Sequence, residues 1–245
     1  MKADLVYLSS ILFLKTGRMK KNILFIAMLL FIGGRAIAKA GSYIEFKITG
    51  SQISGAVKTY SCDGNNRTEV KMTIPGSTAP MVSVSLLLKS NPDTTYVLNV
   101  KDKMYSESKT GKDDQNHKYG NYEITIVGKE KIGNYNCTHI KLHRDGDKTE
   151  REMWLSKDIA GWKTYTATKN SFFERLNIET DQKTKGAEGY PVRISIHEAT
   201  GDLMQIDFVK AEKKDLSEYL FSLKGYKKPK SQLQTRSFVN PVTEQ

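Results

Sequence analysis

Histidine and cysteine are the residues that most readily supply a base, a nucleophile or a metal ligand. This 245-residue chain has four histidines and two cysteines. His139 and His143 stand four residues apart, a spacing that holds a metal when both lie on a helix. Here they flank Ile140 and Leu142 in an alternating stretch, which predicts two side chains on one solvated strand face. No acidic residue stands at a spacing that would complete a ligand set, so no metal site is predicted.

The two cysteines are open to three interpretations. Cys137 precedes His139 by two residues, and these positions share a face of a strand, so a thiol–imidazole contact is one of them. An even number of cysteines in an oxidising compartment favours instead a disulfide between Cys62 and Cys137. Such a bridge closes a loop of about 75 residues, worth roughly 4 kcal/mol in chain entropy. Two buried free thiols are the alternative.

Other catalytic motifs are missing from the sequence. It contains no G-x-S-x-G elbow and no glycine loop of the kind that cradles phosphate. We therefore predict no catalytic residues, no cofactor and no enzyme activity.

The N-terminus has the pattern of an export signal. Lys20 and Lys21 precede an apolar run at 23–32, and Ala36-Ile37-Ala38 places small residues where a signal peptidase reads them. Ten apolar residues span about 15 Å as a helix, roughly half a bilayer core, so no membrane anchor is predicted. We predict a signal peptide over residues 1–38, with the true start at Met1 or Met19, and a periplasmic or secreted mature protein.

The charge of the mature chain argues against nucleic acid as a partner. Residues 1–38 hold six of the 38 basic and one of the 27 acidic residues, which leaves 32 and 26 and a net charge of +6. These charges are interleaved, as in Lys101-Asp102-Lys103, whereas a nucleic-acid-binding protein typically gathers basic residues on one face.

Alternation of apolar and polar residues with a period of two dominates the mature chain and predicts antiparallel strands. Ile44, Phe46 and Ile48 are typical of it. Turn signals such as Asp63-Gly64 separate the strands. We predict a mostly β fold in a single domain over residues 39–228, followed by a loose tail at 229–245.

Helical patterns are few. Residues 170–180 could form a helix with Phe172, Phe173 and Leu176 as its buried stripe. The pattern of apolar positions at 215–223 also predicts a short helix, with one apolar side formed by Leu216, Tyr219, Leu220 and Leu223.

The chain resembles the domain-of-unknown-function family 4412 of secreted bacterial proteins. The resemblance rests on the order of several short segments across most of the mature chain. They are Gly55-Ala56-Val57-Lys58-Thr59-Tyr60, Asn66-Arg67-Thr68-Glu69, Tyr96-Val97-Leu98-Asn99-Val100, Lys103-Met104-Tyr105, Val127 to Thr138, Met153-Trp154-Leu155-Ser156-Lys157-Asp158-Ile159 and Leu223-Lys224-Gly225-Tyr226-Lys227-Lys228. That family is similar in architecture to the periplasmic lipoprotein carriers, and the resemblance implies an antiparallel half-barrel closed by short helices around an apolar cavity.

Two functions are compatible with these observations. The first is a non-catalytic binding protein for a hydrophobic ligand such as a lipid, an acyl chain or a lipidated protein. The second is an interaction or structural protein of the envelope whose apolar face is a filled core. The first predicts a concave apolar wall, for which we expect Phe46, Ile48, Val84, Leu86, Tyr96, Leu98, Phe172, Leu176 and Leu220.

Overall fold

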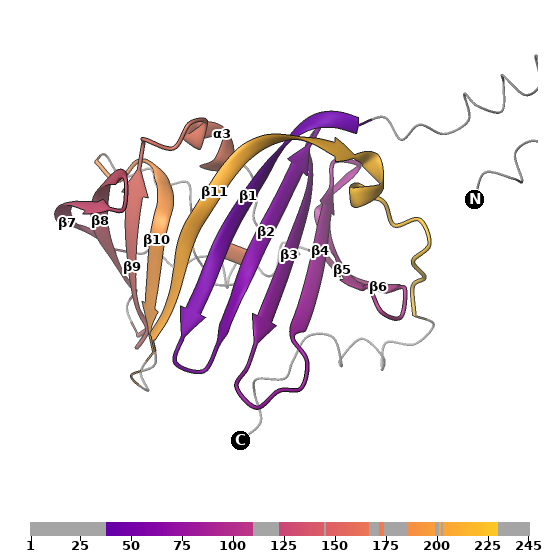
Figure 1. The fold of residues 1–245 in the computed structure, drawn as a ribbon, viewed down its shortest axis with the longest axis horizontal. Helices are drawn as coiled ribbons and strands as arrows, with labels where there is room; N and C mark the ends of the chain where they lie inside the picture. The colour runs from indigo at the N-terminus through magenta and orange to yellow at the C-terminus, as the bar shows by residue number, and fades with distance from the viewer. Residues whose placement is uncertain are drawn as a thin grey trace, which may run out of the picture. The chain divides into compact units, whose positions relative to one another are not determined.

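The computed structural model describes residues 38–109, 123–144, 146–166, 172–173, 186–198, 201 and 203–229. Within these residues eleven antiparallel strands form one sheet in the order β6-β5-β4-β3-β2-β1-β11-β10-β9-β8-β7 (Figure 1). The strands are β1 (Ala38–Gly50), β2 (Ser54–Cys62), β3 (Asn65–Thr73), β4 (Met81–Leu88), β5 (Asn91–Asn99), β6 (Met104–Lys109), β7 (Glu123–Ile132), β8 (Tyr135–His143), β9 (Glu150–Ser156), β10 (Tyr190–His197) and β11 (Leu203–Ser217). A short helix, α3 (Trp162–Thr166), and a 3-10 helix, η3 (Glu218–Phe221), accompany them. The predicted mostly β fold is confirmed.

Tight turns of the predicted kind join neighbouring strands. Asp63 and Gly64 connect β2 to β3 with φ values of 52° and 80°. Two consecutive residues with positive φ make the hairpin turn whose twist suits paired strands. Because this turn has only two residues, it also fixes the register between β2 and β3.

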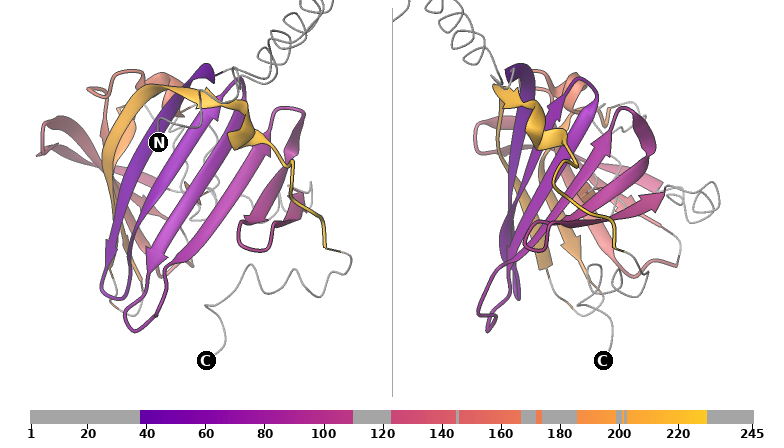
Figure 2. Two further views of the ribbon diagram at one scale, coloured as in Figure 1. Left: turned by 45° about the vertical axis from the view of Figure 1, so that its right-hand side comes forward. Right: turned by 90° about the vertical axis from the view of Figure 1, so that its right-hand side faces the viewer.

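The sheet is strongly curved. Its two edges turn toward the same side in the views of Figure 2, which gives the half-barrel a concave and a convex face. Extra residues in one strand of a pair bend a sheet locally. Register shifts lie between Glu45 and Phe46, between Leu87 and Leu88, between Ile126 and Gly128, and between Pro191 and Arg193.

Aromatic side chains fill the centre of the concave face. Phe46 of β1 is fully buried, and its ring centroid lies 5.0 Å from Phe173, 5.7 Å from Phe208 and 5.9 Å from Tyr190. Helix α3 adds Tyr165, whose ring lies 5.8 Å from that of Tyr190. Edge-to-face contacts of this kind stabilise a core beyond simple area burial. The middle of the half-barrel is therefore packed rather than hollow.

Cross-strand register shows which side chains share a face. Phe46 pairs with Val57, Val57 with Val70, and Val70 with Ser83, so all four belong to the concave face. Val84, the next residue along β4, must then point to the convex face, since successive side chains alternate. The apolar face of the sheet thus changes sides between β3 and β4.

A separate apolar cluster occupies the convex face of β4, β5 and β6. We call it the convex cluster; its buried members are Val84, Leu86, Tyr96 and Leu98. Leu223 and Tyr226 pack against it from the segment that follows β11. We call residues 218–228 the C-terminal strap.

The C-terminal strap crosses from β11 to the far edge of the sheet on the convex side (Figures 1 and 2). Arg67 of β3 donates from Nη1 to the Leu220 carbonyl at 3.2 Å. The Tyr105 amide then donates to the Lys227 carbonyl at 3.0 Å, and the Lys227 amide donates to the Lys103 carbonyl at 2.9 Å. These bonds tie the strap to edge strand β6 and hold its apolar side chains over the convex cluster.

The structure corrects one predicted helix. Residues 215–217 continue β11, because their backbone pairs with residues 38–40 of β1, and only Glu218–Phe221 is helical, as a 3-10 turn. The spacing of Leu216, Leu220 and Leu223 suited a helix, but the sheet ladder extends through Leu216 instead.

Several predictions lie at or beyond the limits of the described residues. Phe172 and Phe173 are helical and buried as expected, whereas Leu176 is outside the described residues. The predicted signal peptide and the tail also lie outside them, apart from Ala38 and Pro229. No helix in the described part of the chain is long and apolar enough to span a membrane.

Candidate functional site

A pocket of about 650 Å³ lies on the concave side, at the end of the sheet where β1 starts, between α3 and strands β1 to β5. We call it the mouth pocket. Its lining is Ala40, Gly41, Ser42, Ser61, Cys62, Asp63, Gly64, Asn66, Leu87, Leu88, Pro92, Gly161, Thr164, Tyr165 and Lys213. Its volume falls within the range of ligand sites, roughly 300–1,000 Å³.

Small residues at the strand ends create this hollow. On the concave face of β1, Ser42 precedes Ile44 and Phe46, both of which are buried in the core. On β2, Ser61 pairs with Ser42 just beyond the buried Thr59. Large side chains fill the middle of the sheet, while hydroxyl-bearing ones leave space at its end.

The walls of the mouth pocket are mixed but contain an alkyl surface. Leu87 and Pro92 come from the β4–β5 hairpin, and Tyr165 comes from α3 on the other side. Leu88 also borders the hollow, but it packs against the convex cluster. Ligand sites commonly combine such apolar walls with a few polar groups that orient the ligand. The arrangement can hold an apolar chain.

Cys62 belongs to the back wall of the mouth pocket. It shares the convex face of β2 with Tyr60 and Lys58, and its thiol donates to the Ala40 carbonyl at 3.7 Å. Burial raises the pKa of the Cys62 thiol, which disfavours the reactive thiolate. Gly41 lies against Cys62, because a Cβ at position 41 would come within 3.2 Å of the Cys62 Cβ.

The predicted disulfide is not formed: Cys62 and Cys137 are both buried free thiols. Cys62 ends β2 and Cys137 lies in β8, with β1, β11, β10 and β9 between these strands in the sheet. A disulfide needs Cα atoms within about 7 Å, whereas each strand step adds about 4.8 Å. An even cysteine count carries no information about this separation.

The predicted apolar wall is divided between the two faces. Phe46, Ile48 and Phe172 belong to the filled concave core. Val84, Leu86, Tyr96 and Leu98 form the convex cluster, and Leu220 lies half-buried in the strap. The expectation that they share one face is corrected by the register between β3 and β4, which period-two alternation alone does not determine.

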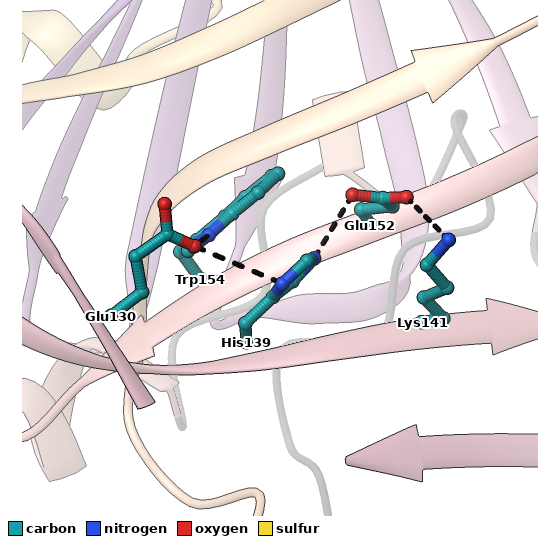
Figure 3. Close-up of polar contacts among 5 residues, drawn as sticks. All are labelled: Glu130, His139, Lys141, Glu152 and Trp154. Atoms are coloured by element: carbon teal, nitrogen blue, oxygen red, sulfur yellow. Dashed lines mark hydrogen bonds and ion pairs between the residues drawn. The ribbon is translucent and has the colours of Figure 1, made fainter. Parts of the chain in front are cut away.

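A polar cluster surrounds His139 on the convex face of β7, β8 and β9 (Figure 3). The imidazole stacks on Trp154 with centroids 4.3 Å apart and an angle of 10° between the rings. Its Nε2 lies 2.9 Å from Glu152 Oε2, and its Nδ1 lies 3.8 Å from Glu130 Oε2. Trp154 Nε1 donates to the same Glu130 oxygen at 2.6 Å, and Lys141 Nζ lies 3.0 Å from Glu152.

These contacts correct the prediction of a solvated His139, whose side chain is only 14% exposed. Burial opposes the charge of Glu152, but hydrogen bonds from Lys141 and His139 outweigh it and lower the Glu152 pKa. Cys137 makes its polar contact with the Tyr135 carbonyl, not with the imidazole. The cluster satisfies the indole N–H of the buried Trp154, and no group of three potential metal ligands occurs among the described residues.

A second hollow, of about 690 Å³, lies at the same end of the sheet near β7, β8 and β9. Its lining is largely charged: Lys129, Glu130, Lys131, Asn136, Cys137, Thr138, Leu155, Lys157, Asp158, Gly186 and Glu188. Lys157 pairs with Glu188 at 2.9 Å, and Asp158 accepts from the Asn136 amide at 2.8 Å. Charged walls do not suit an apolar ligand, so the mouth pocket is the better candidate.

Sequence reasoning missed most residues of the mouth pocket. It favoured large apolar side chains, whereas the pocket exists where the concave positions of β1 and β2 are serines. The available signal was the change from Ile44, Phe46 and Ile48 to Ser42 at the start of one alternating strand.

Fold and site together define an open antiparallel half-barrel with a filled centre and a pocket at its mouth. The chain belongs to the family described as "Domain of unknown function (DUF4412)", whose model matches residues 41–226. No curated protein matches the sequence.

Solved structures with a similar fold include an uncharacterised conserved protein from Thermus thermophilus, with 10% identity over 80% of this chain and 91% of that one and a TM-score of 0.45. The MucA/MucB complex of Pseudomonas aeruginosa matches with 12% identity over 76% of this chain and 56% of that one and a TM-score of 0.39. A DUF1329 family protein from Desulfovibrio piger matches with 11% identity over 84% and 98% and a TM-score of 0.33.

Proposed function

We propose that this protein is an exported, non-catalytic binding protein that holds an apolar ligand in the mouth pocket. One observation carries the proposal: a hollow of about 650 Å³ lies between α3 and the sheet, with alkyl groups on its walls. The core residues around Phe46 fill the middle of the concave face, so the ligand enters only the end of the half-barrel.

The size of the hydrophobic contribution fits reversible binding. Burying about eight methylene groups gains roughly 6 kcal/mol at ~0.8 kcal/mol each, before the entropy costs of binding. Affinities no tighter than micromolar follow, since about 8 kcal/mol corresponds to 1 μM. Such a site takes up and releases a ligand without any covalent step.

The test is titration of the mature protein with N-phenyl-1-naphthylamine, a neutral apolar dye that fluoresces on leaving water. Ser42→Phe and Ser61→Phe place a ring in the mouth pocket and are expected to weaken dye binding at least tenfold. Ser108→Phe, at an exposed position of β6 outside the pocket, is the matched control and is expected to bind like wild type.

Circular dichroism of each variant establishes that the fold is retained. If folded wild type binds no dye, or if both pocket variants bind as well as wild type, the proposal fails. The filled-core interaction protein then becomes the better account.

A further inference from the structure

Lys213 places a positive charge at the mouth pocket. It pairs with Ser42 in the β1–β11 ladder, which puts both side chains on the concave face. It lines the pocket and is exposed at its mouth. An ammonium there can reach a ligand while keeping part of its hydration.

The neighbouring lysines of β11 point the other way. Lys210 and Lys214 lie over the ring of Tyr43 on the convex face, with Nζ 5.2 Å and 5.0 Å from its centroid. Lys214 therefore provides a matched control, because it has the same charge one residue away but belongs to the opposite face.

The acidic residue of the pocket lining already has a partner. Asp63 lies 3.1 Å from Lys39 Nζ, and Lys39 also pairs with Glu218 at 2.9 Å. Within the described part of the chain Lys213 makes no ion pair, and Asp215 on the same face of β11 lies beyond ion-pair distance. The mouth pocket thus combines an alkyl wall with one uncompensated cation.

From this combination we infer that the natural ligand is an anionic amphiphile with a single alkyl chain, bound tail-inward with its carboxylate or phosphate at Lys213. The inference rests on the proposed function and specifies its ligand. The chain contacts Leu87 and Pro92, and the head group remains at the opening, where the ammonium is exposed.

Displacement of the neutral dye tests the inference with dodecanoate, dodecanol and dodecylamine, which share a chain and differ in charge. Wild type is expected to bind the acid about fivefold more tightly than the alcohol, the upper range for an exposed ion pair. Lys213→Gln is expected to remove this preference, and Lys213→Glu to transfer it to the amine. Lys214→Gln and Lys214→Glu are expected to behave like wild type.

Lysophosphatidylglycerol, compared with lysophosphatidylcholine, forms a further arm with one acyl chain that separates a lipid head group from a free acid. Binding that depends on Lys213 in either arm supports the inference, and the stronger arm names the source. If the dye still binds, the inference is overturned by a lack of preference for the anionic ligand in both arms, or by a preference that survives Lys213→Gln. If folded wild type does not bind the dye at all, the proposed function is wrong instead.

Discussion

The division of apolar residues between two faces makes a quantitative prediction about energetic coupling. Leu86 lies in the convex cluster, where Leu223 of the strap packs, while Ile48 lies in the concave core. Leu86→Ala is expected to destabilise the fold by about 3 kcal/mol, because the side chain is fully buried. Leu223 is only half-buried, so Leu223→Ala is expected to cost about 1–2 kcal/mol.

The two losses should not add. Once Leu86 is truncated, Leu223 has less surface to contact, and the double variant should be more stable than the sum predicts by about 0.5–1 kcal/mol. Leu86 and Ile48 lie on opposite faces in β4 and β1, three strand steps and therefore at least about 14 Å apart. Leu86→Ala and Ile48→Val should therefore add within about 0.5 kcal/mol.

Urea unfolding of the mature chain and its variants measures all of these free energies, and a constant slope with denaturant establishes that the comparison is valid. Coupling between Leu86 and Ile48, together with additivity between Leu86 and Leu223, would refute the face assignment. That result would instead restore the single apolar wall expected from alternation.

Three further predictions follow from single contacts. Alkylation in denaturant without reductant should label both Cys62 and Cys137, and a mass two units low with no label would contradict the free thiols. Because the pKa of Glu152 is lowered in the folded protein, this carboxylate contributes fully to stability above its unfolded pKa near 4.5, and the contribution disappears as pH falls through the lower folded value. Glu152→Gln should therefore flatten the dependence of unfolding free energy on pH between 5 and 3, and an unchanged dependence would contradict the role of Glu152. N-terminal sequencing of exported protein should find Lys39 first, because cleavage after Ala38 keeps the contacts of Lys39 with Asp63 and Glu218. A start at Gly41 or a retained Met would contradict this prediction.

Local pattern was sufficient to predict the strands and several turns. Ile44, Phe46 and Ile48 alternate and are buried on one face, and Asp63-Gly64 forms the expected hairpin. Both depend on residues close together in sequence, which is the range over which side-chain period and turn chemistry act.

Contacts that depend on register were not predictable in the same way. A two-residue turn joins β2 to β3, but residues 74–80 join β3 to β4, and a loop of that length leaves the register open. The face of Val84 and Leu86 therefore had to come from the structure. The strap shows a similar limit, because leucine spacing at 216–223 suits a helix while pairing with β1 extends a strand.

The candidate site was the hardest part to predict, since the pocket lies where small side chains leave space. Ser42 and Ser61 have no distinctive chemistry in the sequence, and only their pairing beneath α3 makes a hollow. Lys213 is one of many lysines, and its position opposite Ser42 distinguishes it from Lys214.

Photochemical labelling tests the central claim, that the mouth pocket binds an apolar chain, most directly. A dodecanoic acid carrying a diazirine near its methyl end is bound to the mature protein, irradiated, and located by peptide mass spectrometry. We predict label in the residues at 61–66 and at 161–165, which line the pocket from β2, β3 and α3, with loss of label in Ser42→Phe. Label confined to residues 96–105 and 223–226 of the convex side, or no label above a protein-free control, would contradict the account.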